Sequence, residues 1–263
     1  MTSIKDILEA VASGKITVEK AERELRVASF AEVANIGMLD VNRHERSGVP
    51  EVVFAETKTT EQLCKILEML VEKNEVVLLT RVSQEKLDGM ERNYKDLVFD
   101  VSGSENHYTV LIHSKKWEEP PKEGKIAIMT AGTSDIAYAY EAMAIARLMG
   151  VEVLTFFDVG VAGIHRLVEP IKIIQDEEID AVVVFAGMEG ALPTVVASLI
   201  EIPVIGVPVP TGYGFGGKGE TALASMLQSC APGLAVVNIG NGLGGGSVAS
   251  LIAKRGVKNK GKI

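Results

Sequence analysis

The stretch KIAIMTAGTSD, residues 125–135, decides the fold of the second half of the chain. Its first seven residues form an apolar run without polar alternation, which is typical of a strand buried on both faces of a parallel sheet. The glycine and the three polar residues that follow can start a helix, which we expect to continue to residue 149. Strand, turn and helix in this order make the repeating unit of an α/β sheet.

The same unit recurs four times after this stretch. Strands are predicted at residues 151–157, 180–186, 203–208 and 234–238. The helices that follow them are predicted to end near residues 175, 200, 229 and 255. This repetition predicts an α/β fold with a doubly wound, open parallel sheet. Ligands of such sheets bind outside the carboxyl ends of the strands, where the glycine-rich loops of this sequence fall.

The glycines divide the chain of 263 residues into two parts, because 21 of the 26 lie at or after Gly124. A chain of this length allows one large domain or two modest ones. The segment EEPPKEG, residues 118–124, has two prolines flanked by charges and is typical of an exposed linker. We therefore predict one domain over residues 1–121 and a second over residues 122–263.

The first part of the chain predicts a smaller, mixed α/β domain with a leading helical hairpin. The hairpin spans residues 3–26 and is broken at Gly14. Helices are also predicted at residues 60–73 and 83–94, and strands at residues 49–57, 75–80, 97–101 and 108–113. Before the first strand, Arg43, His44 and Arg46 can hold a phosphate or carboxylate. The alternative is a solvated loop whose charges pair with nearby acids.

The composition excludes several classes of function. Hydrophobic residues make up 47% of the chain and charged residues 24%, as in a soluble globular protein. The net charge of -8 lacks the basic footprint of a nucleic-acid-binding protein, and the apolar runs are too short to span a membrane. The charged N-terminus and the two cysteines predict a protein of the reducing cytoplasm without a disulfide framework.

The loop after the first strand of the second domain is a candidate anion site. Gly132, Thr133 and Ser134 precede a helix, where backbone N–H groups and hydroxyls can face a phosphate. The same residues are also ordinary helix caps. The loop lacks the G-x-G-x-x-G pattern and a Walker lysine, so neither a standard dinucleotide fold nor a P-loop is supported. Two further glycine-rich loops, at residues 212–219 and 238–247, can approach a ligand or pack closely.

Acidic and basic side chains follow the other strands. Glu189 lies between two glycines after the third strand and can act as a general base or bind a cation. Asp158, His165 and Arg166 follow the second strand. We expect these four residues, Asp135 and Cys230 to share one edge of the sheet.

The two cysteines differ in their surroundings. Cys230 lies near the glycine loops and can be a nucleophile, although the helix end before it disfavours a thiolate. An inert core thiol is the alternative. Cys64 is expected to be buried beside an apolar helix stripe.

Two of these motifs resemble a known family. AGTSD at residues 131–135 and GIHR at residues 163–166 resemble the G-S-x-S-D and A-H-R motifs of PurE-type aminoimidazole ribonucleotide carboxylases and mutases. The loop AGMEGALP, residues 186–193, departs from the PurE loop A-G-G-A-A-H-L-P. It introduces Glu189 and has Ala191 at the histidine position. PurE also lacks the N-terminal half and the cysteine of SCAPG, residues 229–233.

Each departure resembles the LarB family of nickel-pincer cofactor biosynthesis, a relative of PurE. The similar stretches are ILEAVASG (7–14), RSGVPEVVF (46–54), TRVS (80–83), SCAPG (229–233) and NIGNG (238–242). The resemblance covers nearly the whole chain, and the combination is specific although each motif alone is weak. It implies a PurE-like, flavodoxin-like second domain.

The resemblance implies a pyridinium-3,5-biscarboxylic acid mononucleotide synthase. Such an enzyme carboxylates nicotinic acid adenine dinucleotide at carbon 5 of the pyridinium ring and hydrolyses its phosphoanhydride to release AMP. This is the first step in making the cofactor of lactate racemase-type enzymes. The co-substrate is carbon dioxide or bicarbonate, Mg²⁺ is expected, and no tightly bound cofactor is expected. Cys230 is carried over as nucleophile, and Glu189 or Asp135 would remove the proton or hold the metal ion.

The partner implied is a small dinucleotide, and the PurE resemblance implies a homo-oligomer, an octamer. The expected substrate-binding residues are Gly132, Thr133, Ser134, Asp158, His165, Arg166, Gly187, Met188, Gly214, Asn241 and Arg46. Three alternatives stay open. The protein can be a PurE-like enzyme of purine synthesis, which would not need Cys230. It can be a nucleotide-binding regulator without catalysis, and its N-terminal half can be only an assembly module.

Overall fold

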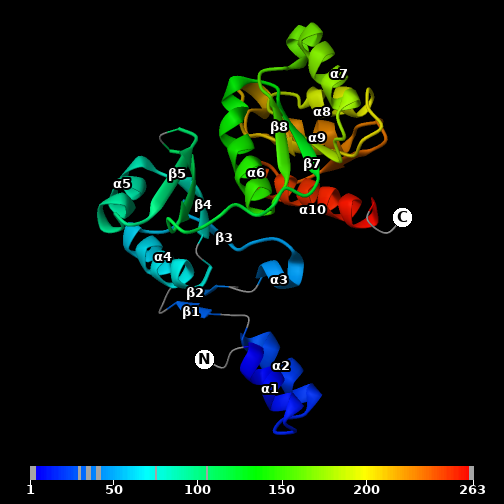
Figure 1. Cartoon of the computed structure of the whole chain (residues 1–263). Helices are drawn as coiled ribbons and strands as arrows, with labels where there is room; N and C mark the ends of the chain where they lie inside the picture. The colour runs from blue at the N-terminus through cyan, green and yellow to red at the C-terminus, as the bar shows by residue number, and fades with distance from the viewer. Residues whose placement is uncertain are drawn as a thin grey trace.

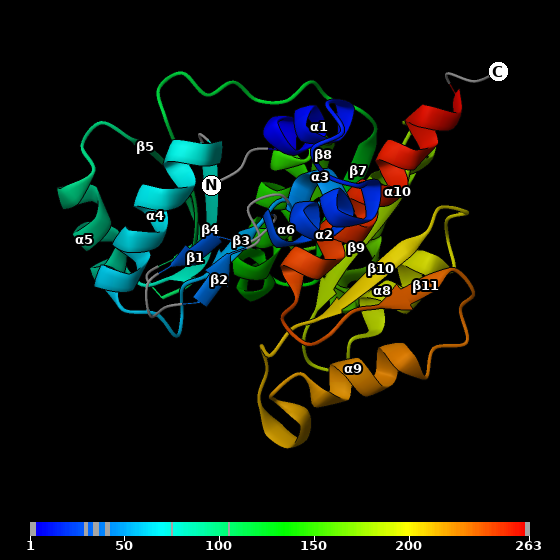
Figure 2. The same cartoon turned by 90° about the horizontal axis from the view of Figure 1, so that it is seen from below.

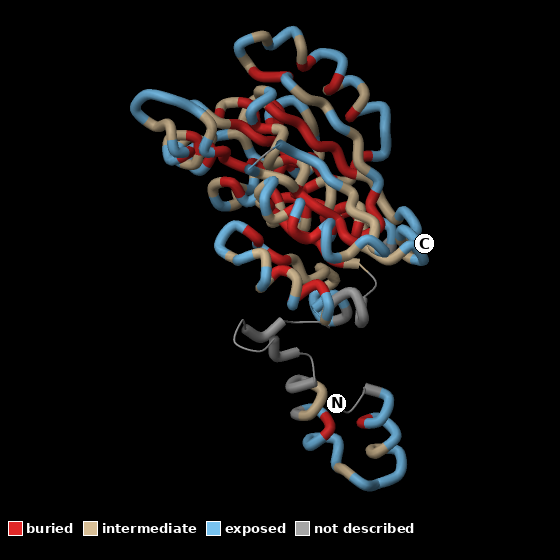
Figure 3. The backbone as a smooth tube through the Cα atoms, turned by 90° about the vertical axis from the view of Figure 1, so that its left-hand side faces the viewer, coloured by how far each residue is buried: buried red, intermediate tan, exposed pale blue. Residues whose placement is uncertain are grey.

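The computed structural model confirms an α/β fold with a five-stranded parallel sheet and a smaller mixed sheet. It describes residues 4–28, 31–33, 37–39, 43–74, 76–104 and 106–260. Figure 1 shows the two sheets side by side, with the hairpin of α1 (Ile4–Ala12) and α2 (Val18–Ala28) away from both. Buried segments concentrate in the two sheets, whereas the hairpin is mostly exposed (Figure 3).

The smaller sheet belongs to the N-terminal part. Its strands lie in the order β3 (Val52–Phe54), β4 (Val76–Val82), β6 (Tyr108–His113) and β5 (Val98–Ser102). Only β3 and β4 are parallel. Helices α4 (Thr60–Asn74) and α5 (Gln84–Asn93) cover one face of the sheet. These elements follow the sequence prediction closely, because each carries a clear apolar period.

Two features of this part were not predicted. Strands β1 (Ala31–Val33) and β2 (Gly37–Leu39) form a separate antiparallel pair. The basic segment that was expected as a loop forms a short helix, α3 (Arg43–Ser47). Ser47 closes this helix, since its hydroxyl donates to the carbonyl oxygen of Arg43 at 2.8 Å.

The larger sheet has five parallel strands. Their order is β11 (Leu234–Val236), β10 (Val204–Pro208), β9 (Ala181–Ala186), β7 (Lys125–Thr130) and β8 (Glu152–Phe156). Helices α6 (Ile136–Leu148) and α10 (Gly242–Lys260) cover one face, and α7 (Val168–Asp176), α8 (Ala191–Ala197) and α9 (Glu220–Leu227) cover the other (Figures 1 and 2). All six residues of β9 are buried, as expected for a strand with helices on both faces.

The glycine run at the start of α10 serves close packing. A Cβ atom on Gly246 would lie 2.6 Å from the Cα of Ala142 on α6, and one on Gly245 would lie 2.8 Å from a methyl group of Val207. Both distances are too short for real Cβ contacts, so any side chain here would separate the helices. These two glycines let α10 approach α6 and the sheet.

The two sheets share a hydrophobic core. Leu78 of β4 and Leu111 of β6 point away from α4 and α5 and pack with the core that contains α6 and α10. The predicted domain boundary at residues 121 and 122 falls in the segment that joins β6 to β7. No helix in the described part of the chain is long and apolar enough to cross a membrane.

Arg81 holds the two parts together at the edge of this core. Its backbone has a φ of 55°, which is unusual for a residue with a side chain. One guanidinium nitrogen donates to the carbonyl oxygen of Gly240 at 2.7 Å, and another donates to Glu141 at 3.2 Å. The Glu141 side chain is only 3% exposed and also lies 3.2 Å from Nε2 of His107. Arg81 and His107 therefore fix the loop after β11 and the middle of α6 to the smaller domain.

We expect Arg81→Met to lower the free energy of unfolding by about 3 kcal/mol, because it leaves the buried Glu141 carboxylate without its guanidinium partner. Urea denaturation measures this loss. Arg43→Met is the matched control, since Arg43 pairs with Glu51 at 3.3 Å on the surface, and losing such a pair costs less than about 1 kcal/mol. Equal losses in the two variants would contradict the role of Arg81.

Candidate active site

The strand order creates a crevice between β7 and β9. The chain passes from β7 outward to β8 and then returns to the other side of β7 to form β9. The loops that follow β7 and β9 therefore diverge, and open α/β sheets bind ligands at this switch point. A cavity of about 430 Å³ lies there, lined by the loops after β7, β8, β9 and β10.

Asp135 is the buried acid of this cavity. It ends the turn Thr133–Asp135 after β7 and is only 3% exposed. The hydroxyl of Thr211 donates to its Oδ1 at 2.5 Å, and the N–H of Gly132 donates to its Oδ2 at 2.8 Å. Burial raises the pKa of Asp135, and these two hydrogen bonds oppose the rise only in part. A carboxyl group with a raised pKa holds a proton more readily, which suits it to exchange a proton with a substrate.

The phosphate-binding loop predicted after β7 lies at the same place. Gly132 and Ser134 line the cavity beside Asp135. Thr133 and Ser134 are exposed, so their hydroxyls are open to a ligand. Thr133 is not among the described residues that line the cavity.

The loop after β8 supplies a cation. Arg166 lines the cavity, and its Nη1 donates to the backbone oxygen of Asp158 at 2.6 Å and to its carboxylate at 2.8 Å. Asp158 adopts a φ of 58°, which turns its backbone oxygen and side chain toward the same guanidinium. Asp158 thus positions Arg166. His165 is exposed and is not among the described residues that line the cavity.

The loop after β9 supplies a second carboxylate. Gly187, Met188 and Glu189 all line the cavity, and Glu189 is exposed. A Cβ atom on Gly187 would clash with the backbone of Thr211, so only glycine fits between these two loops. Met188 has a φ of 50°, a strained conformation of the kind that clusters at functional sites.

Three other expected binding residues do not line this cavity within the described part of the chain. Gly214 lies in the exposed turn Gly214–Gly216. Asn241 caps α10, since its Oδ1 accepts the N–H of Gly244 at 2.8 Å. Arg46 is exposed on α3 of the smaller domain. Their roles in substrate binding stay predictions.

Cys230 lies at the amino ends of the strands, whereas Asp135 lies at their carboxyl ends. The expectation that the two residues share one edge of the sheet within a single chain is therefore wrong. It precedes β11, and the carbonyl oxygen of Gly233 accepts the N–H of Val204 at the start of β10. Cys230 is exposed, and its neighbour Ser229 accepts a hydrogen bond from Thr194 of α8 at 2.9 Å. Its role as a nucleophile stays a prediction. Cys64 is half-buried against the smaller core and not fully buried as expected.

Thr211 is the site residue that sequence analysis missed. It follows β10 by three residues and reaches Asp135 across 76 positions of the chain. Ligands of such sheets bind at the carboxyl ends of the strands, and Thr211 follows the carboxyl end of β10. Its hydroxyl at this position could have identified it from the sequence. Tyr138 was also missed. It lies on α6 near Asp135, and the Arg81 guanidinium carbon is 5.8 Å from its ring centre.

Comparisons with known proteins agree with this arrangement. Residues 30–104 match the LarB/PurE-like N-terminal domain, and residues 125–261 match the AIR carboxylase family. An uncharacterized protein of Methanocaldococcus jannaschii is 44% identical over 96% of this chain and 97% of its own length. The chain belongs to the LarB family. Its second domain is PurE-like, and the family is enzymatic.

About half of the LarB-family chain also resembles N5-carboxyaminoimidazole ribonucleotide mutases. The N5-carboxyaminoimidazole ribonucleotide mutase of Methanocaldococcus jannaschii is 37% identical over 44% of this chain and 68% of its own length. The mutase of Saccharolobus solfataricus is 30% identical over 52% of this chain and 84% of its own length.

We expect Asp135→Asn in this LarB-family protein to lose less stability than the parent as the pH rises. A raised folded-state pKa means that the folded protein holds the proton to a higher pH than the unfolded chain does. The stability contribution is therefore fully present below the unfolded pKa and is lost as pH rises through the folded pKa. Asparagine stays uncharged and avoids this loss.

Thermal denaturation of both proteins between pH 4 and pH 8 measures the effect. The difference in stability between the two proteins should shift in favour of the variant as pH increases. If the stability of the variant relative to the parent is lower at pH 7 than at pH 4, the pKa of Asp135 is not raised.

Proposed function

We propose that this protein carboxylates nicotinic acid adenine dinucleotide at carbon 5 of the pyridinium ring and hydrolyses its phosphoanhydride. The products are pyridinium-3,5-biscarboxylic acid mononucleotide and AMP. The observation that carries the proposal is the composition of the cavity at the switch point. Ala191 lines it at the position of the PurE histidine, and the carboxyl groups of Asp135 and Glu189 line it as well. Proton transfer here would depend on carboxyl groups and not on an imidazole.

The chemistry needs a nucleophile as well as a base. The pyridinium ring is electron-poor, so its carbon 5 does not attack carbon dioxide. Addition of the Cys230 thiolate to the ring gives a dihydropyridine with enamine character, and carbon 5 then forms a bond to carbon dioxide. Loss of the carbon 5 proton to a carboxylate and expulsion of the thiolate restore the aromatic cation. Covalent catalysis thus divides one difficult step into two easier ones.

The residues of the cavity fit the parts of this substrate. Asp135 or Glu189 accepts the carbon 5 proton. Arg166, held by Asp158, binds a carboxylate or phosphate group of the substrate. Gly132 and Ser134 give the backbone and hydroxyl groups that bind phosphate near the start of α6.

Mg²⁺ fits this cavity as a companion of the substrate phosphates. No group of three metal-ligating side chains occurs among the described residues. Asp135 and Glu189 can supply one or two carboxylate oxygens, which is the number that Mg²⁺ takes from a protein when phosphates and water complete its shell. Bound there, the ion would favour attack on the phosphoanhydride.

If Cys230 is the nucleophile, a second copy of the chain must bring it to the cavity. The five residues of β10 span about 16 Å between the edge with Cys230 and the edge with the cavity, whereas reacting atoms must approach to about 3.5 Å. Exposed apolar side chains occur at both edges. Tyr213 is 82% exposed and Phe215 fully exposed beside the cavity, and Leu227 is 67% exposed near Cys230. Another copy of the chain can cover these exposed apolar groups, so we propose a homo-oligomer in which Cys230 of one copy enters the cavity of another.

The products of the wild-type protein test the activity. With nicotinic acid adenine dinucleotide and bicarbonate, mass spectrometry should detect AMP and a doubly carboxylated mononucleotide. Cys230→Ser should reduce carboxylation by at least about a thousandfold, because a hydroxyl is a far weaker nucleophile than a thiolate. Cys64→Ser is the matched control and should keep its activity. Full activity of Cys230→Ser would exclude the covalent step.

The same assay tests the alternative that the protein is a PurE-like enzyme of purine synthesis. The similarity to N5-carboxyaminoimidazole ribonucleotide mutases favours it over a non-catalytic role. Turnover of aminoimidazole ribonucleotides by wild type and by Cys230→Ser, with no turnover of the nicotinate dinucleotide, would establish it in place of the proposed function.

Mixed oligomers test the sharing of the site. Cys230→Ala and Asp135→Asn chains are each first assayed alone to establish that they are inactive, and are then co-expressed with different tags and purified through both. If the site combines two copies, about a quarter of the sites in a random mixture contain both functional residues, so activity returns to that level. If both residues must come from one chain, the mixture stays inactive. Wild-type chains carrying the two tags provide the reference activity.

A further inference from the structure

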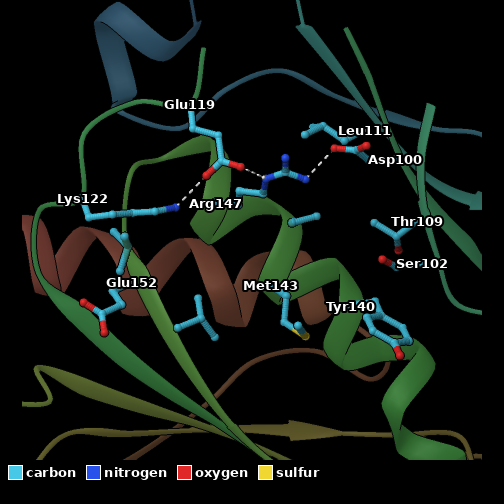
Figure 4. Close-up of a pocket in the computed structure, with 13 residues that line it drawn as sticks. Asp100, Ser102, Thr109, Leu111, Glu119, Lys122, Tyr140, Met143, Arg147 and Glu152 are labelled. Carbon is cyan, nitrogen blue, oxygen red and sulfur yellow. Dashed lines mark hydrogen bonds and ion pairs between the residues drawn. The ribbon is translucent and has the colours of Figure 1, made fainter. Parts of the chain in front are cut away.

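A second cavity lies between the two domains, and it shares no lining residue with the first (Figure 4). Its volume is about 420 Å³, which is sufficient for a small organic molecule. One wall is the outer part of the smaller sheet, β5 and β6, and the other is α6 with β8. Ligand sites occur preferentially at domain interfaces of this kind.

The sheet wall carries a hydroxyl that has no partner. Thr109 pairs with Ser102 across the β5–β6 ladder, and Leu111 pairs with Asp100, so all four side chains lie on one face. Thr109 is 2% exposed, and its Oγ1 has no hydrogen-bond partner among the described residues. Figure 4 shows Thr109 and Ser102 facing the side chains of α6 across the cavity. Buried hydroxyls in native proteins are nearly always hydrogen-bonded, so this one points to a missing acceptor or donor.

The helix wall is mostly apolar. Tyr140, Met143, Ala144 and Arg147 line the cavity, and their spacing places them along one stripe of α6. The Met143 thioether and the methyl group of Ala144 offer a soft apolar surface opposite Leu111. A slot between a helix and a sheet, with apolar groups on both sides, suits a planar ring.

The charged groups that line the cavity already have partners. Arg147 donates to Asp100 at 2.7 Å and to Glu119 at 2.7 Å, and Lys122 donates to Glu119 at 3.0 Å (Figure 4). The fifth charged group, Glu152, lies 3.1 Å from Lys125. An anionic ligand would have to displace one of these carboxylates, which favours a ligand without charge.

We propose that this cavity binds a neutral heteroaromatic molecule of nucleobase or nucleoside size. Its ring lies between Met143 and Leu111, and a polar atom of the ring exchanges a hydrogen bond with the Thr109 hydroxyl. The carboxylate oxygens of Asp100 can also accept hydrogen bonds from hydroxyl groups of a sugar. Such a ligand contacts both domains at once, so it binds only where they are docked as in this structure.

Titration calorimetry of the full chain with adenosine tests the proposal. The wild type should bind adenosine in a saturable way, and Thr109→Val should weaken this binding by about tenfold, since the ring loses its hydrogen bond. Thr109→Val should also unfold at the same temperature as the parent or a higher one, because it removes an unpartnered hydroxyl without changing the side-chain volume. The part of the binding that is weakened by Thr109→Val should be weaker for AMP than for adenosine.

Ser250→Ala is the matched control. Ser250 is the other described residue with a buried hydroxyl that lacks a partner, and it lines neither cavity. Its replacement should leave adenosine binding within about twofold of the wild type. Met143→Trp, which fills the slot, should abolish the Thr109-dependent binding.

Three results would overturn the proposal. The first is the absence of saturable adenosine binding to the wild type. The second is equal binding by the wild type and Thr109→Val. The third is Thr109-dependent binding of AMP that is as tight as that of adenosine, which would show an anion site in place of a neutral one.

Discussion

The burial of the central strands on both faces is the constraint on which the rest of the structure depends. All six residues of β9 are buried, so this strand has no room for a functional side chain along its length. Polar groups can therefore gather only at the strand ends, and the reversal of winding between β7 and β9 opens a space there. Asp135 lies in that space, and the same burial that stabilises the sheet raises the pKa of its carboxyl group.

The smaller domain holds two elements of the second domain in place through Arg81. Arg81 bonds the carbonyl oxygen of Gly240, in the loop between β11 and α10, and the buried carboxylate of Glu141 on α6. Its backbone is held in a conformation that costs free energy for a residue with a side chain. Arg81 thus has a strained backbone and a side chain that bonds both domains. This arrangement fixes the second domain to the first, and a module that served only for assembly would not need such a contact.

The sequence predicts those parts of the fold whose signal is local. The runs that become β7 and β9 are apolar and continuous, and Gly132 to Asp135 follow directly, so the edge that carries the site was predictable. The pair β1 and β2 was not, because strands of three residues carry too little pattern. The Arg81–Gly240 contact joins positions 159 apart, which no periodicity reveals. The edge on which Cys230 lies was available from the sequence, since SCAPG precedes a parallel strand and therefore begins at its amino end.

Helix α6 joins the first cavity, the Arg81 contact and the second cavity. Asp135 precedes its first turn, Glu141 in its middle binds Arg81, and Met143 and Arg147 near its end line the second cavity. A helix of 13 residues is about 20 Å long and moves as one body. A ligand between α6 and the smaller sheet would therefore fix the position of the helix that begins at Asp135. Helix α6 is therefore one physical connection between the two cavities, and β8 with the loop that follows it is another.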